Sequence, residues 1–212
     1  MSAELTITPL GRRHKRAFVA LMCRAFVDDP IFLHLYPGDR GARERAMRPF
    51  LSFMFDATGW RGDMRLGLFR DGGLVACALV DRPHAGAVRA AMGQALTMAR
   101  FLPLIFGLGI GKTGFLTRYM DETRKAAPGA AHHYLAMIGV DPAAQGQGFG
   151  RRMIAGLADL ASRHPGSAGI ALDTENEANI PFYRGQGFDL RAWVDIGPCQ
   201  AASLFRPRED MT

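Results

Sequence analysis

The chain has 212 residues, of which 48% are hydrophobic and 22% are charged, and its formal net charge at pH 7 is +6. This composition excludes an intrinsically disordered chain, because such chains are poorer in apolar residues and less balanced in charge. The longest apolar run, Phe101 to Ile110, is broken by proline and glycine and is far shorter than the roughly 20 residues that span a bilayer. We therefore expect a single domain over residues 1–212, with no membrane partner.

The cysteines and the N-terminal sequence predict a protein of the cytoplasm. Cys23, Cys77 and Cys199 are odd in number and far apart, which indicates neither a disulfide framework nor a thiolate metal site, and we expect no metal. The first residues lack the layout of a secretory signal peptide. The positive charge favours an anionic ligand, but the basic residues are dispersed and form no recognised nucleic-acid module. We expect a monomer or a homodimer that binds no nucleic acid.

Hydrophobic periodicity divides the first half of the chain into a strand, two helices and a hairpin. A period of two predicts strands, and apolar residues three and four positions apart predict helices. The predicted elements are a short strand ending at Pro9, helices over residues 17–26 and 42–57, and strands over residues 65–69 and 74–80. Asp71-Gly72-Gly73 supplies the positive φ angles of a tight hairpin turn. The segment with Phe32 and Tyr36 is predicted as a loop, and Thr58 and Gly59 as the end of the second helix.

The second half of the chain begins with an insert at about residues 84–129, which we predict to be partly helical. Tyr134 to Val140 is a nearly continuous apolar run, typical of a strand buried on both faces. The elements predicted after it are helices over residues 150–161 and 181–186 and strands over residues 169–173, 190–196 and 201–206. The resulting order predicts an α/β fold in which helices pack on a mixed sheet.

A glycine-rich turn follows the buried strand and leads directly into a helix. The turn, Gln145 to Gly150, contains three glycines. Glycines let the backbone approach a ligand closely, and the free N–H groups at a helix start favour a pyrophosphate. Arg151 and Arg152 add positive charge where the helix dipole alone would favour acidic residues, so we expect an anion there. The dinucleotide pattern GxGxxG is not met, because Arg151 stands where that pattern needs glycine.

Gln145, Gly148 and Gly150 fit a pattern of Gln or Arg, two residues, Gly, one residue, and Gly or Ala, which resembles the acyl-CoA loop of the GNAT superfamily of acyltransferases. A second stretch, Asn176 to Phe188, resembles the Asn…Tyr…Gly-Phe segment of that family. Within the superfamily, the likeness is greatest to the puromycin N-acetyltransferases and their bacterial relatives. The resemblance implies a mixed, mostly antiparallel, twisted sheet that is flanked by helices and splayed between its two central strands.

The resemblance also implies an activity, the acetyl-CoA-dependent N-acetylation of a primary amine of a small molecule by direct attack on the thioester. In the family, the strand before the loop lies beside the pantetheine arm and polarises the thioester carbonyl. The cofactor-binding residues implied here are Ile138, Gly139, Val140, Gln145, Gly146, Gln147, Gly148, Phe149, Gly150, Arg151, Asn176, Asn179 and Tyr183. Asn176 would bind the pantetheine arm, and Tyr183 would protonate the departing thiolate. Asn176 and Asn179 also suit the cap of the helix that follows them.

The sequence leaves open which group takes the proton of the amine. Many relatives use a Glu on the strand before the loop, but residues 134–140 contain no carboxylate. The remaining candidates are Asp173, Glu175, His132, His133 and a water molecule, and the resemblance favours Asp173 as the catalytic base. The residues predicted to line the acceptor pocket are Phe26, Asp29, Phe32 and Tyr36. The missing strand carboxylate keeps open a non-catalytic, acyl-CoA-binding regulatory domain, although the intact Tyr183 argues against it.

Overall fold

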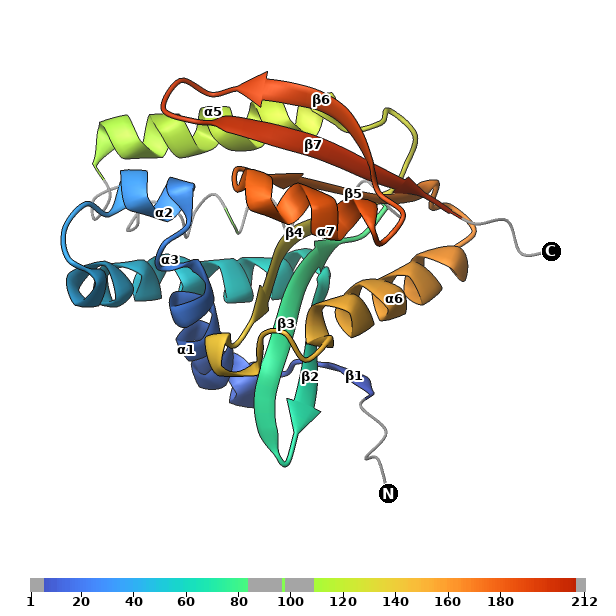
Figure 1. The fold of residues 1–212 in the computed structure, drawn as a ribbon, viewed down its shortest axis with the longest axis horizontal. Helices are drawn as coiled ribbons and strands as arrows, with labels where there is room; N and C mark the ends of the chain where they lie inside the picture. Colours follow the sequence, from blue (N-terminus) through green and yellow to red (C-terminus); the bar gives the residue numbers. More distant parts are fainter. Residues whose placement is uncertain (1–5, 84–96, 98–108, 209–212) are drawn as a thin grey trace.

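The computed structural model describes residues 6–83, 97 and 109–208 (Figure 1). The helices are α1 (Lys15–Phe26), α2 (Pro30–Leu35), α3 (Arg40–Arg61), α5 (Ile110–Ala126), α6 (Phe149–Ser162) and α7 (Ile180–Arg184). The strands are β1 (Ile7–Pro9), β2 (Met64–Arg70), β3 (Gly73–Asp81), β4 (His133–Val140), β5 (Gly169–Thr174), β6 (Asp189–Asp195) and β7 (Gln200–Pro207). Single 3-10 turns precede α1, α6 and α7, at Arg12–His14, Pro142–Ala144 and Glu177–Asn179.

The strands form one sheet in the order β1-β2-β3-β4-β5-β7-β6. Neighbouring described strands are antiparallel except β4 and β5, which are parallel. β4 pairs with β3 along most of its length, from Tyr134 opposite Asp81 to Val140 opposite Ala76. With β5 it pairs only at His133 and Tyr134. The two halves of the sheet therefore separate after Tyr134, which confirms the predicted α/β fold with a mixed, mostly antiparallel sheet splayed at its centre.

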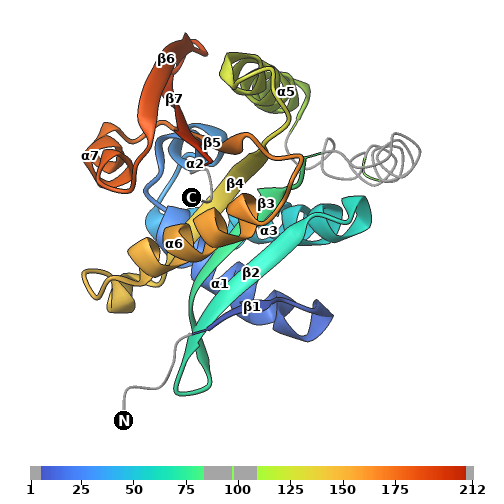
Figure 2. The same ribbon diagram turned by 90° about the vertical axis from the view of Figure 1, so that its right-hand side faces the viewer.

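Two hydrophobic cores cover the two faces of the sheet, because successive side chains of a strand point to opposite faces. On β3, Ala76 and Ala78 belong to the core that includes α6. Cys77 and Leu79 belong to the core that includes α1, α2 and α3. Figure 2 shows α1 and α3 on one side of the sheet and α6 on the other. α5 packs against β6 and β7 and so covers the half of the sheet beyond the split.

The prediction of a loop around Phe32 and Tyr36 is wrong, because residues 30–35 form the helix α2. The Oδ1 atom of Asp29 accepts a hydrogen bond from the Ile31 N–H at 3.0 Å, and Pro30 takes the first position of the helix. Both features favour a helix start, since Asp caps free N–H groups and proline has none to satisfy. Asp29-Pro30 therefore ends α1 and starts α2 at the same time.

The second predicted helix is longer than its hydrophobic period indicates. α3 begins at Arg40, where Asp39 accepts a hydrogen bond from the Ala42 N–H at 2.9 Å, and it continues to Arg61. The predicted end at Thr58 is wrong, because the Thr58 hydroxyl donates to a carbonyl one turn earlier and leaves the helix intact. Gly62, with a φ of 78°, ends the helix in the left-handed conformation that glycine favours.

The insert predicted at about residues 84–129 lies partly outside the described residues. In its described part, residues 110–126 form α5, whereas residues 84–96 and 98–108 fall outside. No helix within the described ranges combines the length and the apolar character needed to cross a membrane. Within the same ranges, no group of three or more His, Cys, Asp or Glu side chains is placed to hold a metal ion.

Candidate active site

A cavity of about 150 Å³ lies in the split between β4 and β5. Residues 135–138 of β4 line one side of the cavity, and residues 172–175 at the end of β5 line the other. Side chains from α2, α3, α5 and α7 close the remaining sides, and many of these side chains are apolar or aromatic. The split in the sheet therefore forms two sides of the cavity.

Three of the four residues predicted to line an acceptor pocket do line this cavity, namely Phe26, Asp29 and Phe32. The ring of Phe26 lies 5.8 Å from that of Phe32, so the two form one aromatic wall. Tyr36 is not among the lining residues, because its ring is stacked on Phe32 at 6.3 Å, behind that wall. Burial raises the pKa of the Asp29 carboxyl to about 6. A carboxylate in an aromatic wall suits a ligand that is both cationic and apolar.

β4 presents a backbone edge to the split. In the described ladder, its residues after Tyr134 have no partner on β5, and Ile138 lines the cavity. Gly139 lies against α1, where an added Cβ would be 2.8 Å from the Met22 Sδ atom and 3.2 Å from the Ala25 Cβ. Its lack of a side chain thus lets α1 pack on β4. Backbone N–H groups along this edge are fixed in place and can polarise a carbonyl oxygen.

The turn after β4 has the geometry of an anion site. Gly146 and Gly148 have φ angles of 77° and 80°, and no atom lies within 4 Å of the position that a Cβ would take. The Arg152 N–H donates to the Gly148 carbonyl at 3.1 Å, which is the first i to i−4 bond of α6. The N–H groups of residues 149–151 therefore precede that ladder and have no helical partner. Arg151 is exposed in the same turn of the helix.

Other residues of the turn have structural contacts. Phe149 is 4% exposed and belongs to the core, so only its backbone is left for a ligand. Gly150 packs against the Phe182 ring, which would lie 3.2 Å from an added Cβ. The Gln147 side chain accepts a hydrogen bond from Arg70, and the Gln145 amide donates to the Val140 carbonyl at 3.5 Å. The two glutamine side chains thus brace the turn.

The predicted asparagines lie at the end of β5. Asn176 caps the 3-10 turn after the strand, since its Oδ1 atom accepts a hydrogen bond from the Ala178 N–H at 3.1 Å. Asn179 lines the cavity, and its Nδ2 atom donates to the Thr174 hydroxyl at 3.4 Å. The cap uses only the side-chain oxygen of Asn176. Because Asn176 is exposed, its side-chain amide nitrogen can be reached by a ligand.

Tyr183 is 7% exposed and lines the cavity from α7. Its ring packs between Phe182 and Phe188, with centroid distances of 5.3 Å and 5.8 Å. Burial raises the pKa of Tyr183, and the nearby Asp173 and Glu175 raise it further. The phenol therefore holds its proton at neutral pH and is suited to donate it.

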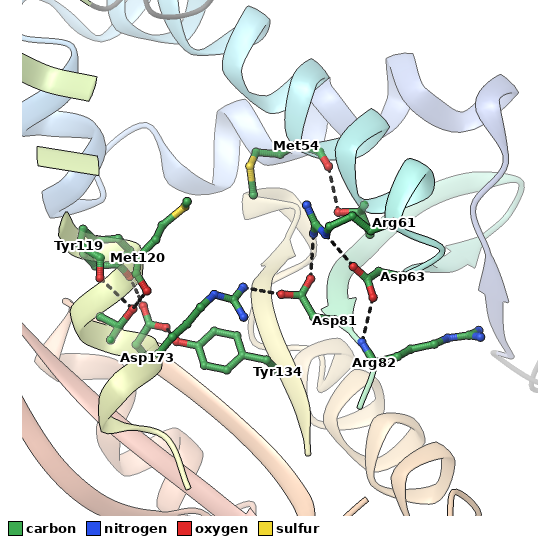
Figure 3. Close-up of polar contacts among 12 residues, drawn as sticks. Met54, Arg61, Asp63, Asp81, Arg82, Tyr119, Met120, Tyr134 and Asp173 are labelled. Carbon is green, nitrogen blue, oxygen red and sulfur yellow. Dashed lines mark hydrogen bonds and ion pairs between the residues drawn. The ribbon is translucent and has the colours of Figure 1, made fainter. Parts of the chain in front are cut away.

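Two carboxyl groups face each other at the end of β5. The Tyr119 hydroxyl is in hydrogen-bond contact with Asp173, and the Tyr134 hydroxyl donates to the other oxygen of Asp173 (Figure 3). The Tyr119 hydroxyl also contacts Glu175. Burial raises the pKa of Glu175 to about 8, and repulsion by Asp173 and Asp29 adds to this effect. Near neutral pH, a group with such a pKa can both hold and accept a proton.

A series of ion pairs begins beside Tyr134, at the wall of the cavity (Figure 3). The guanidinium of Arg124 on α5 lies 4.4 Å from the centroid of the Tyr134 ring and pairs with Asp81. Asp81 also pairs with Arg61 at 2.9 Å, and Arg61 pairs with Asp63 at 2.8 Å. Although burial opposes it, the two arginines hold the pKa of Asp81 below its usual value. These ion pairs connect α3, β3 and α5 beside β4.

The two histidines considered as bases lie away from the cavity. The ring of His133 is in hydrogen-bond contact with Ser167 at 2.9 Å, and burial lowers its pKa to about 4. The ring of His132 contacts the Ala130 carbonyl at 2.7 Å. Neither histidine is among the lining residues, so the carboxyl groups are the better candidates for the base.

Tyr119, Arg124 and Tyr134 are residues of the site that sequence reasoning missed. On α5, Leu116, Tyr119 and Thr123 recur at helical spacing, and all three line the cavity. This spacing shows that the three share a helix face, but it does not show which surface that face meets. Tyr134 was predicted only as part of a buried apolar strand.

The raised pKa of Glu175 predicts that the stability of the protein depends on pH. Its pKa of about 8 in the folded protein exceeds the ordinary value of 4.5, so folding favours its protonated form. The stability from this proton is fully present below pH 4.5 and is lost as the pH rises towards 8. Glu175→Gln removes the titration, so its Tm should fall less than that of the wild type between about pH 6 and pH 9. An equal fall would contradict the burial of this charge. The exposed Glu177→Gln is the matched control.

Comparisons with known proteins agree with this arrangement. Residues 50–188, more than half of the chain, match the acetyltransferase (GNAT) family model. The chain is 35% identical to N-alpha-acetyltransferase RimI of Mycobacterium tuberculosis over 81 residues, which cover 38% of this chain and 50% of that protein. It is 38% identical to a mycothiol acetyltransferase of a Nocardioides species over 69 residues, which cover 32% of this chain and 23% of that protein.

A crystal structure from Corynebacterium glutamicum, described as histone acetyltransferase HPA2 and related acetyltransferase, shares the fold. Its TM-score is 0.71 at 18% sequence identity, and the match covers 99% of both chains. The two sequence matches span half of the length of RimI and about a quarter of that of the mycothiol acetyltransferase. These two relatives therefore do not define the activity of this chain. The likeness to the puromycin N-acetyltransferases stays a prediction. On the family match over residues 50–188, the chain belongs to the acetyltransferase (GNAT) family.

Proposed function

We propose that this protein transfers the acetyl group of acetyl-CoA to a primary amine of a small cationic molecule. The observation that carries the proposal is the cavity in the split of the sheet. It joins Tyr183, the edge of β4 and the carboxyl groups of Asp29, Asp173 and Glu175 in one space. A nucleophilic amine, a polarised carbonyl and a proton donor can meet there.

The residues around the split fit acetyl-CoA. The free N–H groups at the start of α6 and the left-handed glycines before it suit the pyrophosphate. The unpaired edge of β4 has the length and direction to bind an extended pantetheine arm through its backbone. Bound acetyl-CoA would supply the acetyl group as an activated thioester. The placement of the glycine turn and of the β4 edge supports this part of the proposed cofactor site.

In the proposed reaction, the protein orients the amine and handles two protons. The N–H groups near Ile138 polarise the thioester carbonyl as charge develops on its oxygen. Attack by the amine forms the C–N bond, and the C–S bond then breaks. The surplus proton of the nitrogen goes to the carboxyl groups of Asp173 and Glu175, and Tyr183 gives its proton to the departing sulfur. A regulatory domain without catalysis would need neither group at this place.

The cavity favours a small cationic acceptor. Asp29, Asp173 and Glu175 supply negative charge from two sides, and Phe26 and Phe32 supply aromatic surface. A volume of about 150 Å³ fits a small amine. The likeness to RimI favours a second candidate, the N-terminal amine of a peptide or protein. The two candidates differ in whether a bare small amine is sufficient as the acceptor.

Binding of CoA is the first test of the proposal. A ligand at one hundred times its Kd stabilises a protein by about 2.7 kcal/mol, which corresponds to roughly 5–10 °C in Tm for a chain of this size. We expect such a shift with CoA or acetyl-CoA at millimolar concentration. We expect a much smaller one in Gly148→Val, because the backbone of a valine does not easily adopt the left-handed conformation found at Gly148. No shift in the wild type would contradict the proposed function.

The acceptor is then identified by the release of free CoA thiol. We expect turnover with small primary amines that carry an apolar or aromatic group, and little with amines that also carry a carboxylate. Matched short peptides with free and blocked N-termini test the second candidate. Turnover with the free peptides alone would favour a protein acceptor and overturn the small-molecule assignment.

A further inference from the structure

The carboxyl groups of Asp173 and Glu175 are joined through a single hydroxyl group. The Tyr119 Oη atom is in hydrogen-bond contact with the Asp173 Oδ2 and Glu175 Oε1 atoms. The Tyr134 Oη atom contacts the Asp173 Oδ1 atom. Figure 3 shows Asp173 between Tyr119 and Tyr134. Both oxygens of Asp173 are therefore engaged, and the Glu175 side chain is linked to Asp173 through the Tyr119 hydroxyl.

Counting protons fixes how these contacts can be satisfied. A phenol has one proton to donate, so Tyr119 can donate to only one of its two carboxyl neighbours. The other contact joins two oxygens, and it is a hydrogen bond only if that carboxyl group carries a proton. Asp173 already accepts from Tyr134, so it is best placed to be the ionised partner. The contacts of Tyr119 with Glu175 and Asp173 are thus both hydrogen bonds when the extra proton is on Glu175.

We propose that Asp173 and Glu175 share one proton through the hydroxyl of Tyr119 and act together as a single proton acceptor. This inference rests on the proposed function and assigns to α5 a part in the reaction. Movement of the Glu175 proton to the Tyr119 oxygen, with movement of the Tyr119 proton to Asp173, transfers one proton between the carboxyl groups and leaves the phenol neutral. When both carboxylates are ionised, the pair takes up the proton that the acetylated nitrogen loses.

The surroundings of the pair support this sharing. Asp29 at the start of α2 adds negative charge, and burial with these neighbours raises the pKa of Glu175 to about 8. Burial and the two carboxylates raise the pKa of Tyr119 well above its usual value, so the phenol stays protonated. Arg124 faces the pair from α5, but it is paired with Asp81. The other titratable groups that face the pair are Tyr134 on β4, Tyr183 on α7 and Cys199 before β7.

Two phenol-to-phenyl variants test the proposal through the pH dependence of kcat/KM. The shared hydrogen bonds stabilise the singly protonated pair, so their loss in Tyr119→Phe makes the last proton easier to remove. The rising limb of the profile should move to lower pH by about one unit, the size expected for one hydrogen bond to a charged group. Tyr134→Phe removes a donor to ionised Asp173, so its limb should move to higher pH by a similar amount.

The opposite directions of the two pH shifts distinguish a shared proton from a hydroxyl group that only donates to the carboxylates. An upward shift in both variants would mean that Tyr119 donates to the carboxylates as Tyr134 does, and would overturn the shared proton. Lower activity in Tyr119→Phe with an unmoved limb would overturn it as well, since a merely structural residue acts in that way. If the wild type acetylates no amine at any pH, the proposed function fails instead.

A measurement without turnover keeps the two failures apart. Infrared absorption distinguishes a protonated carboxyl group from a carboxylate, so at neutral pH the wild type should show a carboxylic acid band that Glu175→Gln lacks. In Tyr119→Phe the band should persist only to a lower pH. Absence of the band in the wild type near pH 7 would overturn the shared proton whether or not the enzyme is active.

Discussion

Tyr183→Phe is expected to lower kcat by about 10²- to 10³-fold and to leave the Kd for CoA nearly unchanged. Tyr183 lines the cavity and is 7% exposed. Burial and the neighbouring carboxylates keep its hydroxyl group protonated. Without this proton the departing thiolate must take one from water, although the ring still fills its place between Phe182 and Phe188. The measurement is thiol release at saturating amine, with CoA binding followed by calorimetry.

Tyr36→Phe is the matched control for this variant. Tyr36 is a half-buried tyrosine near the cavity, but it lies behind Phe32 and does not line the space. Its kcat should stay within about twofold of the wild type, as for a substitution that removes no transition-state contact. A fully active Tyr183→Phe enzyme would remove Tyr183 as the acid and leave water as the proton source.

Gly169→Ala is expected to lower the free energy of unfolding by about 3 kcal/mol or more. Gly169 starts β5 opposite Pro207 with a φ of 150°. An added Cβ would lie 2.1 Å from the Arg206 carbonyl oxygen and 2.9 Å from the Pro207 Cα. These are backbone atoms of the neighbouring strand, so they cannot move aside without breaking the pairing of β5 with β7. Urea unfolding followed by circular dichroism measures the loss.

Gly166→Ala, three residues earlier, separates this clash from a general effect of replacing glycine. The nearest atoms to its added Cβ belong to the His164 ring, at 3.5 Å, which is an ordinary contact. We expect a change below about 1 kcal/mol. Equal stability of the Gly169→Ala protein and the wild type would mean that β5 and β7 lie further apart than the structure places them.

Local patterns predicted the part of the site that is continuous in sequence. The apolar strand, the glycine turn and the next helix follow one another as β4, residues 145–148 and α6, because each depends on neighbours within a few residues. The hairpin at Asp71-Gly72 is also present, and both residues have positive φ angles. The split between β4 and β5 came from the family resemblance, since nothing in a strand's own sequence says how far its neighbour pairs with it.

The part of the site that depends on distant contacts was not predicted. Tyr119 lies 54 residues before Asp173 and 56 before Glu175, and only the packing of α5 on the far half of the sheet brings them together. Asp29 was predicted as a pocket residue, but its cap on α2 also fixes the carboxyl group. Its raised pKa results from burial by elements that are remote in sequence.

The position of α5 has a consequence for the order in which the molecule is built. β1 to β4 form a continuous half-sheet with α1 to α3 on one face, and α5 is synthesised before β4. Its packing partners β6 and β7 follow β4 and β5 in the chain. Contacts between segments so far apart close slowly, because the intervening chain must first be ordered. The cavity for the amine is therefore completed only after β6 and β7 have been synthesised, later than the loop at the start of α6.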